Sequence, residues 1–171
     1  HRDLHRLIRR QRQMCIRDSC KAFQWARNAK PEQPLTTAVW NMDLQNITKA
    51  ILDLSDIITF HNYGDLSAVQ KQVSYLKSYK RPIVCTEWMA RHYGSLFQTH
   101  LPFFKQEKIG CYCWGLVNGK TQTHLPWWSS AGNSESRMWF HDILHQDGTP
   151  YQEEEVEVIQ KYTRSSVAGS S

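Results

Sequence analysis

Long apolar runs are missing from this sequence, and their absence excludes a membrane-spanning helix from the prediction. Hydrophobic residues make up 40% of the 171 residues, but nowhere do about 18 of them follow one another, as a span requires. The basic N-terminus is not followed by an apolar segment, so these residues predict no secretory signal peptide. With charged residues at 22%, the composition is that of a globular chain. No membrane partner is expected.

After the first twenty residues, positive and negative charges are nearly balanced. Residues 1–20 hold six Arg against two Asp, so they carry +4 of the formal net charge of +5 and leave +1 for the rest. A body this close to neutral gives little reason to expect a nucleic acid partner. Binding of nucleic acid therefore has support only in residues 1–20.

The first twenty residues differ in kind from those that follow. The hexapeptide Met14–Ser19 resembles the translation of an adapter used in sequencing libraries, which predicts a non-native leader over residues 1–20. Two alternatives stay open. Apolar side chains within Leu4–Ile8 have the spacing of a basic amphipathic helix. The arginines are also typical of an arm that binds nucleic acid.

Regularly spaced cysteines are also absent. The five cysteines are odd in number and irregular in spacing, which argues against a disulfide framework. Cys85 and Cys111 fall in predicted buried strands, where a free thiol acts as a small hydrophobe. His141 and His145 have an i, i+4 spacing that suits a metal, but no third ligand is evident. We therefore predict no metal and no cofactor.

What the sequence does have is a repeating order of strand and helix. β-Branched and aromatic residues dominate four short segments, at residues 34–41, 56–61, 83–86 and 109–115. Apolar residues at helical spacing surround them, at residues 22–29, 47–54, 66–76, 96–104 and 153–163. Apolar strands that alternate with helices predict a parallel sheet covered by helices, which is an α/β fold.

Four βα units of this kind make half of a (β/α)8 barrel, which typically takes about 250 residues. The rival architecture is a doubly wound sheet, and the lack of a Gly-rich phosphate loop after any strand weakens it. We predict a partial TIM-barrel domain over residues 21–163, with outer helices, and a disordered tail over residues 164–171. The open first and last strands of a half-barrel predict self-association through their edges.

Three local features accompany this plan. Asp65 and Ser95 stand where each could cap the helix that follows it. The run Glu153–Glu155 is predicted to form a solvated first helical turn, where negative charge is favourable. Residues 118–148 are irregular and aromatic, and they predict a long loop after the last strand.

Polar or aromatic side chains stand at the carboxyl end of each predicted strand, and in a barrel these ends converge on one pocket. Glu87, which ends the apolar run at residues 83–86, is the one carboxylate among them. A carboxylate can stabilise an oxocarbenium-like transition state, and Tyr or His can orient it by hydrogen bonds. Aromatic rings suit the C–H face of a sugar. The full set is Trp40, Asn41, His61, Tyr63, Glu87, Trp88 and Trp114.

Three of these strand ends resemble the C-terminal half of a clan A glycoside hydrolase, a (β/α)8 barrel close to family 5 and to the barrel domain of family 2. The matching motifs are Thr86-Glu87-Trp88, His61-Asn62-Tyr63 and Tyr112-Cys113-Trp114-Gly115. The stretch Trp114–Trp127, with residues 139–144 and 147–151, is similar to bacterial proteins labelled cellulase-like or xylanase-like. The resemblance covers residues 21–163.

The resemblance implies a retaining glycosidase acting on β-linked oligo- or polysaccharides, with Glu87 as the nucleophile at the end of the seventh barrel strand. The residues then expected to bind the carbohydrate substrate are His61, Tyr63, Trp114, Trp40, Asn41 and Trp88. Full-length relatives are usually exported, so an extracellular or periplasmic parent is expected. The family's acid/base glutamate, in an Asn-Glu pair that ends the fourth strand, has no match here. We therefore expect a fragment with little or no activity alone.

Plainer functions of the polar residues stay open. Glu87 could form an ion pair with Arg91 or Lys120, and His61 could be a hydrogen-bonded structural histidine. Under that interpretation the strand ends would stabilise the fold without carrying any chemistry.

The aromatic residues have alternatives as well. Trp40 and Trp88 could be packing residues, while Trp127 and Trp128 fit both a sugar platform and a pin for the long loop. A non-catalytic carbohydrate-binding domain would use the same aromatic side chains, and it is the second function that the sequence supports.

Overall fold

The structure, a computed structural model, describes residues 17–129 and 138–164 and shows two compact units. Of these residues, 17–61 and 72–84 form the first unit, and 62–71, 85–129 and 138–164 form the second. Residues 17–28 are helical, as expected for the end of the helix predicted at residues 22–29. Most of the predicted leader (residues 1–16) and of the predicted tail (residues 165–171) lies outside the described residues.

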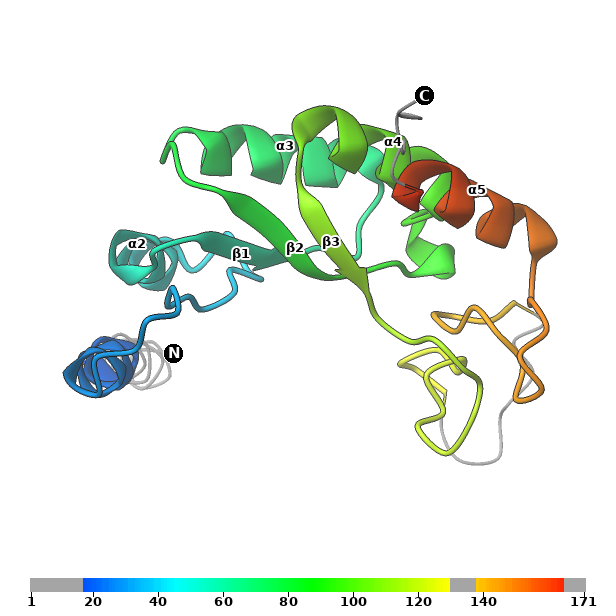
Figure 1. Cartoon of the computed structure of the whole chain (residues 1–171), viewed down its shortest axis with the longest axis horizontal. Helices are drawn as coiled ribbons and strands as arrows, with labels where there is room; N and C mark the ends of the chain where they lie inside the picture. The colour runs from blue at the N-terminus through cyan, green and yellow to red at the C-terminus, as the bar shows by residue number, and fades with distance from the viewer. Residues whose placement is uncertain (1–16, 130–137, 165–171) are drawn as a thin grey trace, which may run out of the picture. The chain divides into compact units, whose positions relative to one another are not determined.

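Three strands form one parallel sheet in the order β1-β2-β3, so the expected α/β fold class is confirmed (Figure 1). The strands are β1 (Ile58–His61), β2 (Ile83–Trp88) and β3 (Gly110–Cys113). In β1 the apolar side chains of Ile58 and Phe60 are buried in the first unit. Each strand lies within a segment that the sequence predicted as a strand, except that β2 runs two residues further than residues 83–86.

The strand predicted at residues 34–41 is wrong in extent, because only Val39 forms a bridge, to Phe60 in parallel. The backbone N–H of Leu35, earlier in this segment, donates to a side chain and not to the backbone of β1. The carboxylate of Asp56 accepts the backbone N–H of Leu35 at 2.8 Å, an N–H that a longer ladder would need. Pro34 has no N–H to donate at all. The segment therefore runs beside β1 without pairing along it.

Helices accompany the strands close to where the spacing of apolar residues predicted them. They are α2 (Gln45–Leu54), α3 (Leu66–Lys77), α4 (Phe97–Glu107) and α5 (Glu153–Thr163), with a 3-10 turn η1 (Arg91–Tyr93) before α4. Helices α4 and α5 lie side by side in the second unit (Figure 1). No helix among the described residues is both long enough and apolar enough to cross a membrane.

One of the two predicted helix caps is confirmed and the other is wrong. Asp65 accepts the backbone N–H of Ala68 through its Oδ1 at 2.9 Å, so it caps α3. The residue that precedes α4 is Leu96, which makes no side-chain cap. Ser95 is instead fully buried, and its hydroxyl accepts the backbone N–H of Met89 at 3.3 Å. A serine that is used inside the core is not available to the helix end.

The prediction of a solvated turn at Glu153–Glu155 is wrong for Glu155, which is buried against Arg91. The guanidinium donates to both carboxylate oxygens, from Nε at 2.8 Å and from Nη2 at 2.5 Å. It also donates to the backbone carbonyls of Trp139 at 3.1 Å and Asp142 at 2.9 Å. This buried ion pair, which we call the Arg91–Glu155 clamp, ties η1, the segment at residues 139–142 and α5 together.

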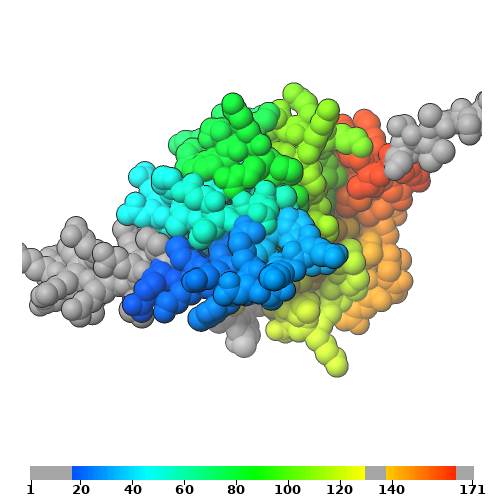
Figure 2. Space-filling view, turned by 60° about the vertical axis from the view of Figure 1, so that its left-hand side comes forward, coloured from blue at the N-terminus to red at the C-terminus, as the bar shows by residue number. Residues whose placement is uncertain are grey.

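The long loop predicted at residues 118–148 is irregular over its described parts, but it is tied at its base. Val117 bridges Leu144 in parallel, and Leu144 bridges Pro150 in antiparallel fashion. Figure 2 accordingly shows the yellow-green segment after β3 and the orange segment before α5 side by side.

Gly115 allows the chain after β3 to approach this second segment closely. Its φ is +82°, in the left-handed region that favours glycine. A Cβ atom added there would lie 2.6 Å from Oδ1 of Asp142 and 2.8 Å from Cβ of His141. The position therefore has room for glycine alone.

Candidate functional site

A hydrogen bond between Tyr63 and Glu87 is the centre of the candidate site in the second unit. The phenol of Tyr63 lies 2.8 Å from Oε2 of Glu87, and both residues are partly buried. Glu87 is the next-to-last residue of β2, and its backbone carbonyl accepts the N–H of Asn62 at 3.1 Å. The strand end and the segment that carries Tyr63 are thus held together by backbone as well as by side chain.

The phenol is the donor in this hydrogen bond. Burial raises the pKa of Tyr63 most, and the hydrogen bond to Glu87 and its negative charge raise it further. Tyr63 therefore keeps its proton at every physiological pH, and the carboxylate accepts. A neutral donor orients Glu87 without cancelling the charge of the carboxylate.

His141 lies beside Tyr63, with 5.5 Å between the ring centroids. Its Nδ1 is 2.5 Å from the carbonyl oxygen of Met89, and because a carbonyl only accepts, Nδ1 carries the proton. Burial lowers the pKa of His141, partly offset by that hydrogen bond and by the charges of Asp142 and Glu87. The neutral ring then presents a lone pair at Nε2, which has no hydrogen-bond partner among the described residues.

Trp127 completes the contacts around Tyr63. The two rings meet edge to face at 5.0 Å, and Trp127 lies 5.5 Å from His141. Tyr63 is therefore fixed by a carboxylate on its hydroxyl and by two rings on its sides.

Trp114 directly follows β3, its backbone N–H donates to the carbonyl of Trp88 at 2.9 Å, and its side chain is exposed.

Trp88 belongs to the core of the second unit and not to the candidate site. Its side chain is 1% exposed and stacks on His100 at 5.4 Å, with Phe104 against it edge to face at 5.3 Å. Successive residues of a strand point to opposite faces, so Trp88 turns away from the face that carries Glu87. The structure thus places Trp88 as the packing residue that the sequence allowed, on the face of β2 opposite to Glu87.

Three of the predicted ligand-contacting residues belong to the first unit. Trp40 is exposed. Asn41 is occupied locally, since its Oδ1 accepts the backbone N–H of Asp43 at 2.9 Å in the turn before α2. His61 ends β1, and its backbone N–H donates to the carbonyl of Val39 at 2.9 Å. A role for these three side chains in binding substrate stays a prediction.

The structure also bears on the ion pair that the sequence allowed for Glu87. Arg91, one of its two suggested partners, is taken by Glu155 in the Arg91–Glu155 clamp. Arg91 therefore belongs to the scaffold of the second unit.

A second polar cluster, which the sequence analysis missed, lies next to His141 along the chain. Asp142 is fully buried, and its Oδ1 accepts the hydroxyl of Thr123 at 2.5 Å. Its Oδ2 lies 3.8 Å from Nδ1 of His124. The signal in the sequence was an adjacent His-Asp pair within an aromatic stretch, but neither residue follows a strand or helix period.

Cys85 and Cys111 of the second unit are shielded from water. Burial raises the pKa of Cys85, and it raises the pKa of Cys111 to about 11. Both thiols therefore stay protonated at neutral pH, which agrees with their predicted role as small hydrophobes. Over residues 17–129 and 138–164, no group of three or more His, Cys, Asp or Glu side chains is placed to hold a metal ion.

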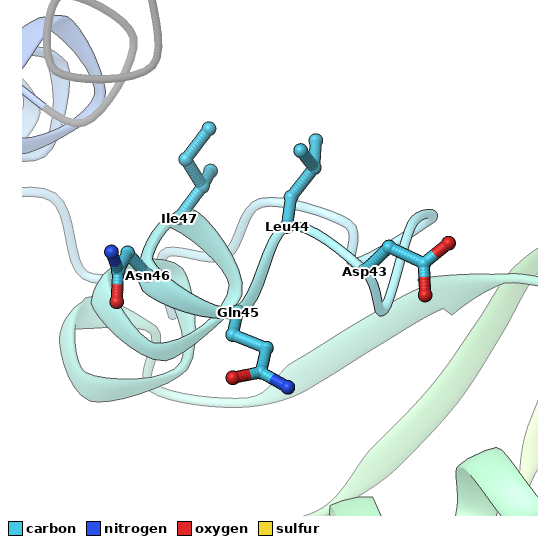
Figure 3. Close-up of a pocket in the computed structure, with 5 residues that line it drawn as sticks. All are labelled: Asp43, Leu44, Gln45, Asn46 and Ile47. Carbon is cyan, nitrogen blue, oxygen red and sulfur yellow. The ribbon is translucent and has the colours of Figure 1, made fainter. Parts of the chain in front are cut away.

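Two hollows lie away from the Tyr63–Glu87 pair. One, of about 190 Å³, lies in the first unit at the start of α2, where Leu44 and Ile47 point to one side while Gln45 points to another (Figure 3). Asp43, Gln45 and Asn46 are its polar lining residues, and their side chains point in different directions (Figure 3). The other, of about 310 Å³, is an apolar space between β3, α4 and α5 with Trp88 and Cys111 in its wall. Neither hollow offers groups for catalysis.

Comparisons with known proteins add no assignment to this geometry. No family model matches the chain, and no curated protein matches it significantly.

Proposed function

We propose that the second unit carries the nucleophile side of a retaining glycoside hydrolase site, with Glu87 as the nucleophile. The observation that supports this most is the 2.8 Å hydrogen bond from the phenol of Tyr63 to Oε2 of Glu87. A nucleophilic carboxylate has to be ionised, correctly turned and close to groups that exclude water. Tyr63 turns it, and Trp127 and His141 pack around Tyr63.

The proposed reaction is the cleavage of a β-linked O-glycosidic bond. A carboxylate oxygen of Glu87 attacks the anomeric carbon, and the bond to the leaving oxygen breaks as that oxygen takes a proton from a carboxylic acid. Water then hydrolyses the glycosyl ester, releasing the sugar and Glu87. In this scheme the sheet is part of a (β/α)8 barrel, which the parallel strands, the helices between them and a carboxylate at a strand's carboxyl end support.

Apart from Glu87, no residue at the carboxyl ends of the predicted strands is a carboxylic acid that could act as the proton donor. Retaining enzymes place their two carboxyl groups about 5–5.5 Å apart. We therefore expect the isolated chain to hydrolyse ordinary aryl β-glycosides slowly or not at all. An activated substrate removes this difficulty, because its leaving group needs no proton.

The experiment uses 2,4-dinitrophenyl 2-deoxy-2-fluoro-β-glucoside and the matching xyloside, which can form the glycosyl ester without acid assistance. Intact mass and peptide mapping should show one added fluorosugar, on the peptide that contains Glu87. Glu87→Gln should abolish the label. Glu154→Gln, which changes an exposed carboxylate of α5, should leave it unaltered. Labelling of another carboxylate, or equal labelling of Glu87→Gln, would overturn the assignment.

A carbohydrate-binding domain without catalysis is the second candidate, and the exposure of Trp114 and Trp127 favours it. Under that function the chain binds neutral oligosaccharides, Glu87→Gln binds them as the unaltered protein does, and the fluoroglycosides label nothing.

A further inference from the structure

Three exposed aromatic side chains gather at one place in the second unit, around a ring that is completely buried. Tyr93, Trp127 and Trp128 are 45%, 56% and 59% exposed. All three contact Phe140, with ring centroids at 5.7, 4.8 and 5.5 Å respectively, and Phe140 itself is buried. Tyr93 also lies 5.7 Å from Trp127 and 6.1 Å from Trp128. We call these three residues the aromatic platform.

Phe140, on which the aromatic platform packs, is tied to the scaffold of the second unit. Phe140 accepts the backbone N–H of Arg91 through its carbonyl at 3.1 Å, so η1 and the segment that carries the buried ring are joined. The guanidinium of the same Arg91 is locked in the Arg91–Glu155 clamp. A set of large apolar rings that is fixed in place and exposed to water is costly unless a ligand covers it. Pinning of the loop accounts for Phe140, but not for rings that are about half exposed.

The platform is continuous with the Tyr63–Glu87 pair. Trp127 belongs to the platform and also contacts Tyr63 edge to face at 5.0 Å, while Tyr63 donates to Glu87. The rings therefore succeed one another from the carboxylate outward, through Tyr63, Trp127 and Tyr93, to Trp128. A ligand that is long and has repeated flat, apolar faces matches this order.

The charge near the platform selects among such ligands. Residues 121–129 contain no Asp, Glu, Lys or Arg. Of the two basic residues within η1, Arg91 and His92, the arginine is paired with Glu155. An acidic glycan would thus lose water from its carboxylates without gaining a permanently charged partner from residues 121–129 or from Arg91.

We propose that the aromatic platform is a binding subsite for the outer sugar rings of a neutral, β-linked oligosaccharide whose reacting ring lies at Glu87. The inference rests on the function proposed above, and it adds both a substrate class and a place for the rings that do not react. The C–H faces of successive sugars stack on Tyr93, Trp127 and Trp128. The affinity for the substrate then grows with its length.

The test measures binding of cellohexaose and xylohexaose to the full chain by isothermal titration calorimetry, with an oligogalacturonate of the same length as the charged probe. Trp128→Ala and Tyr93→Ala should each weaken binding of a neutral hexasaccharide roughly three- to tenfold. Trp25→Ala and Tyr75→Ala are matched controls, because both side chains are exposed and belong to the first unit. They should leave the affinity unchanged.

Several outcomes would overturn the subsite. They are failure of the folded chain to bind either neutral hexasaccharide, equal binding of the oligogalacturonate, and equal effects of the platform and control variants. Trp128→Ala should still be labelled at Glu87 by the fluoroglucoside at an unchanged rate, since that probe has one ring. If no protein is labelled while binding depends on Trp128, the platform stands and the proposed catalytic function fails. If Glu87 is labelled while binding is independent of Trp128, the catalytic function stands and the platform fails.

Discussion

Two glutamates of the second unit occupy opposite kinds of surroundings. Glu155 is buried and shares two charged hydrogen bonds with Arg91. Glu87 is only partly buried, and the donor seen on its Oε2 is the neutral phenol of Tyr63. The guanidinium on both oxygens commits Glu155 to the scaffold, whereas the phenol of Tyr63 orients Glu87 and adds no positive charge of its own. The surroundings of a glutamate therefore say more about its role than its place in the sequence does.

The largest effect is expected when one member of the Arg91–Glu155 clamp is removed, which tests whether Glu155 has a structural role. Arg91→Met or Glu155→Leu alone leaves an unpaired buried charge, which typically costs about 3–5 kcal/mol of folding free energy. The double variant removes both charges and should regain most of the loss. Urea unfolding measures the three free energies. A double variant as unstable as the single ones would contradict the assignment.

An exposed ion pair serves as the control for the clamp. Lys49 and Asp53 lie one helical turn apart in α2, with 2.6 Å between Nζ and Oδ2, and both are largely exposed. Asp53→Asn should change stability by no more than about 0.5 kcal/mol. A large loss there would mean that the effect at Arg91 is not a matter of burial.

Tyr63→Phe tests the other side of the comparison. The substitution keeps the ring that packs on Trp127 and His141 but removes the hydroxyl that Glu87 accepts. Because the pair is only partly buried, we expect a loss of about 1 kcal/mol by urea unfolding. The rate of fluoroglycoside labelling at Glu87 should fall as well. Tyr75→Phe, which alters an exposed tyrosine, should change neither quantity.

The smallest effect concerns pH and the buried histidines. Burial lowers the pKa of His100 and of His141 in the folded protein. The unfolded chain takes up these protons near pH 6.5, above the folded values, so it binds more protons than the folded chain does. Stability from these groups is therefore present above about pH 6.5 and is lost as the pH falls below it.

Urea midpoints at pH 8 and pH 5.5 measure this loss. His141→Gln should reduce the dependence on pH, whereas His145→Gln, at an exposed position, should not. An unchanged dependence in His141→Gln would show that the buried ring takes up its proton freely.

Local periodicity was enough to predict most of the secondary structure. The helix predicted at residues 153–163 coincides with α5, and the carboxylate at the end of residues 83–86 was placed correctly on β2. Both depend on patterns of apolar residues that the sequence shows directly. Asp65 was also predictable, because the helix that it caps starts next to it in the chain.

Long-range partners explain what the sequence could not predict. Glu155 looked like a solvated helix start, and its burial depends on Arg91, 64 residues away. The strand at residues 34–41 shrank to one bridge because Asp56, 21 residues from Leu35, takes the amide of Leu35. His141 was considered only as a metal ligand and Asp142 was not singled out, because irregular loops follow no period. The alternation of side chains between the two faces of a strand would have predicted that Trp88 and Glu87, as neighbours in β2, point in opposite directions.

Gly115 carries a consequence for how this protein can vary. The chain turns there in a conformation that side chains resist, and the nearest oxygen stands where a methyl group would have to be. The segment that brings His141 towards Tyr63 can therefore keep its position only because Gly115 has no Cβ atom. A side chain at this position would collide with Asp142 and His141 and so displace the segment that carries both residues. We expect any descendant that keeps this architecture to keep glycine here.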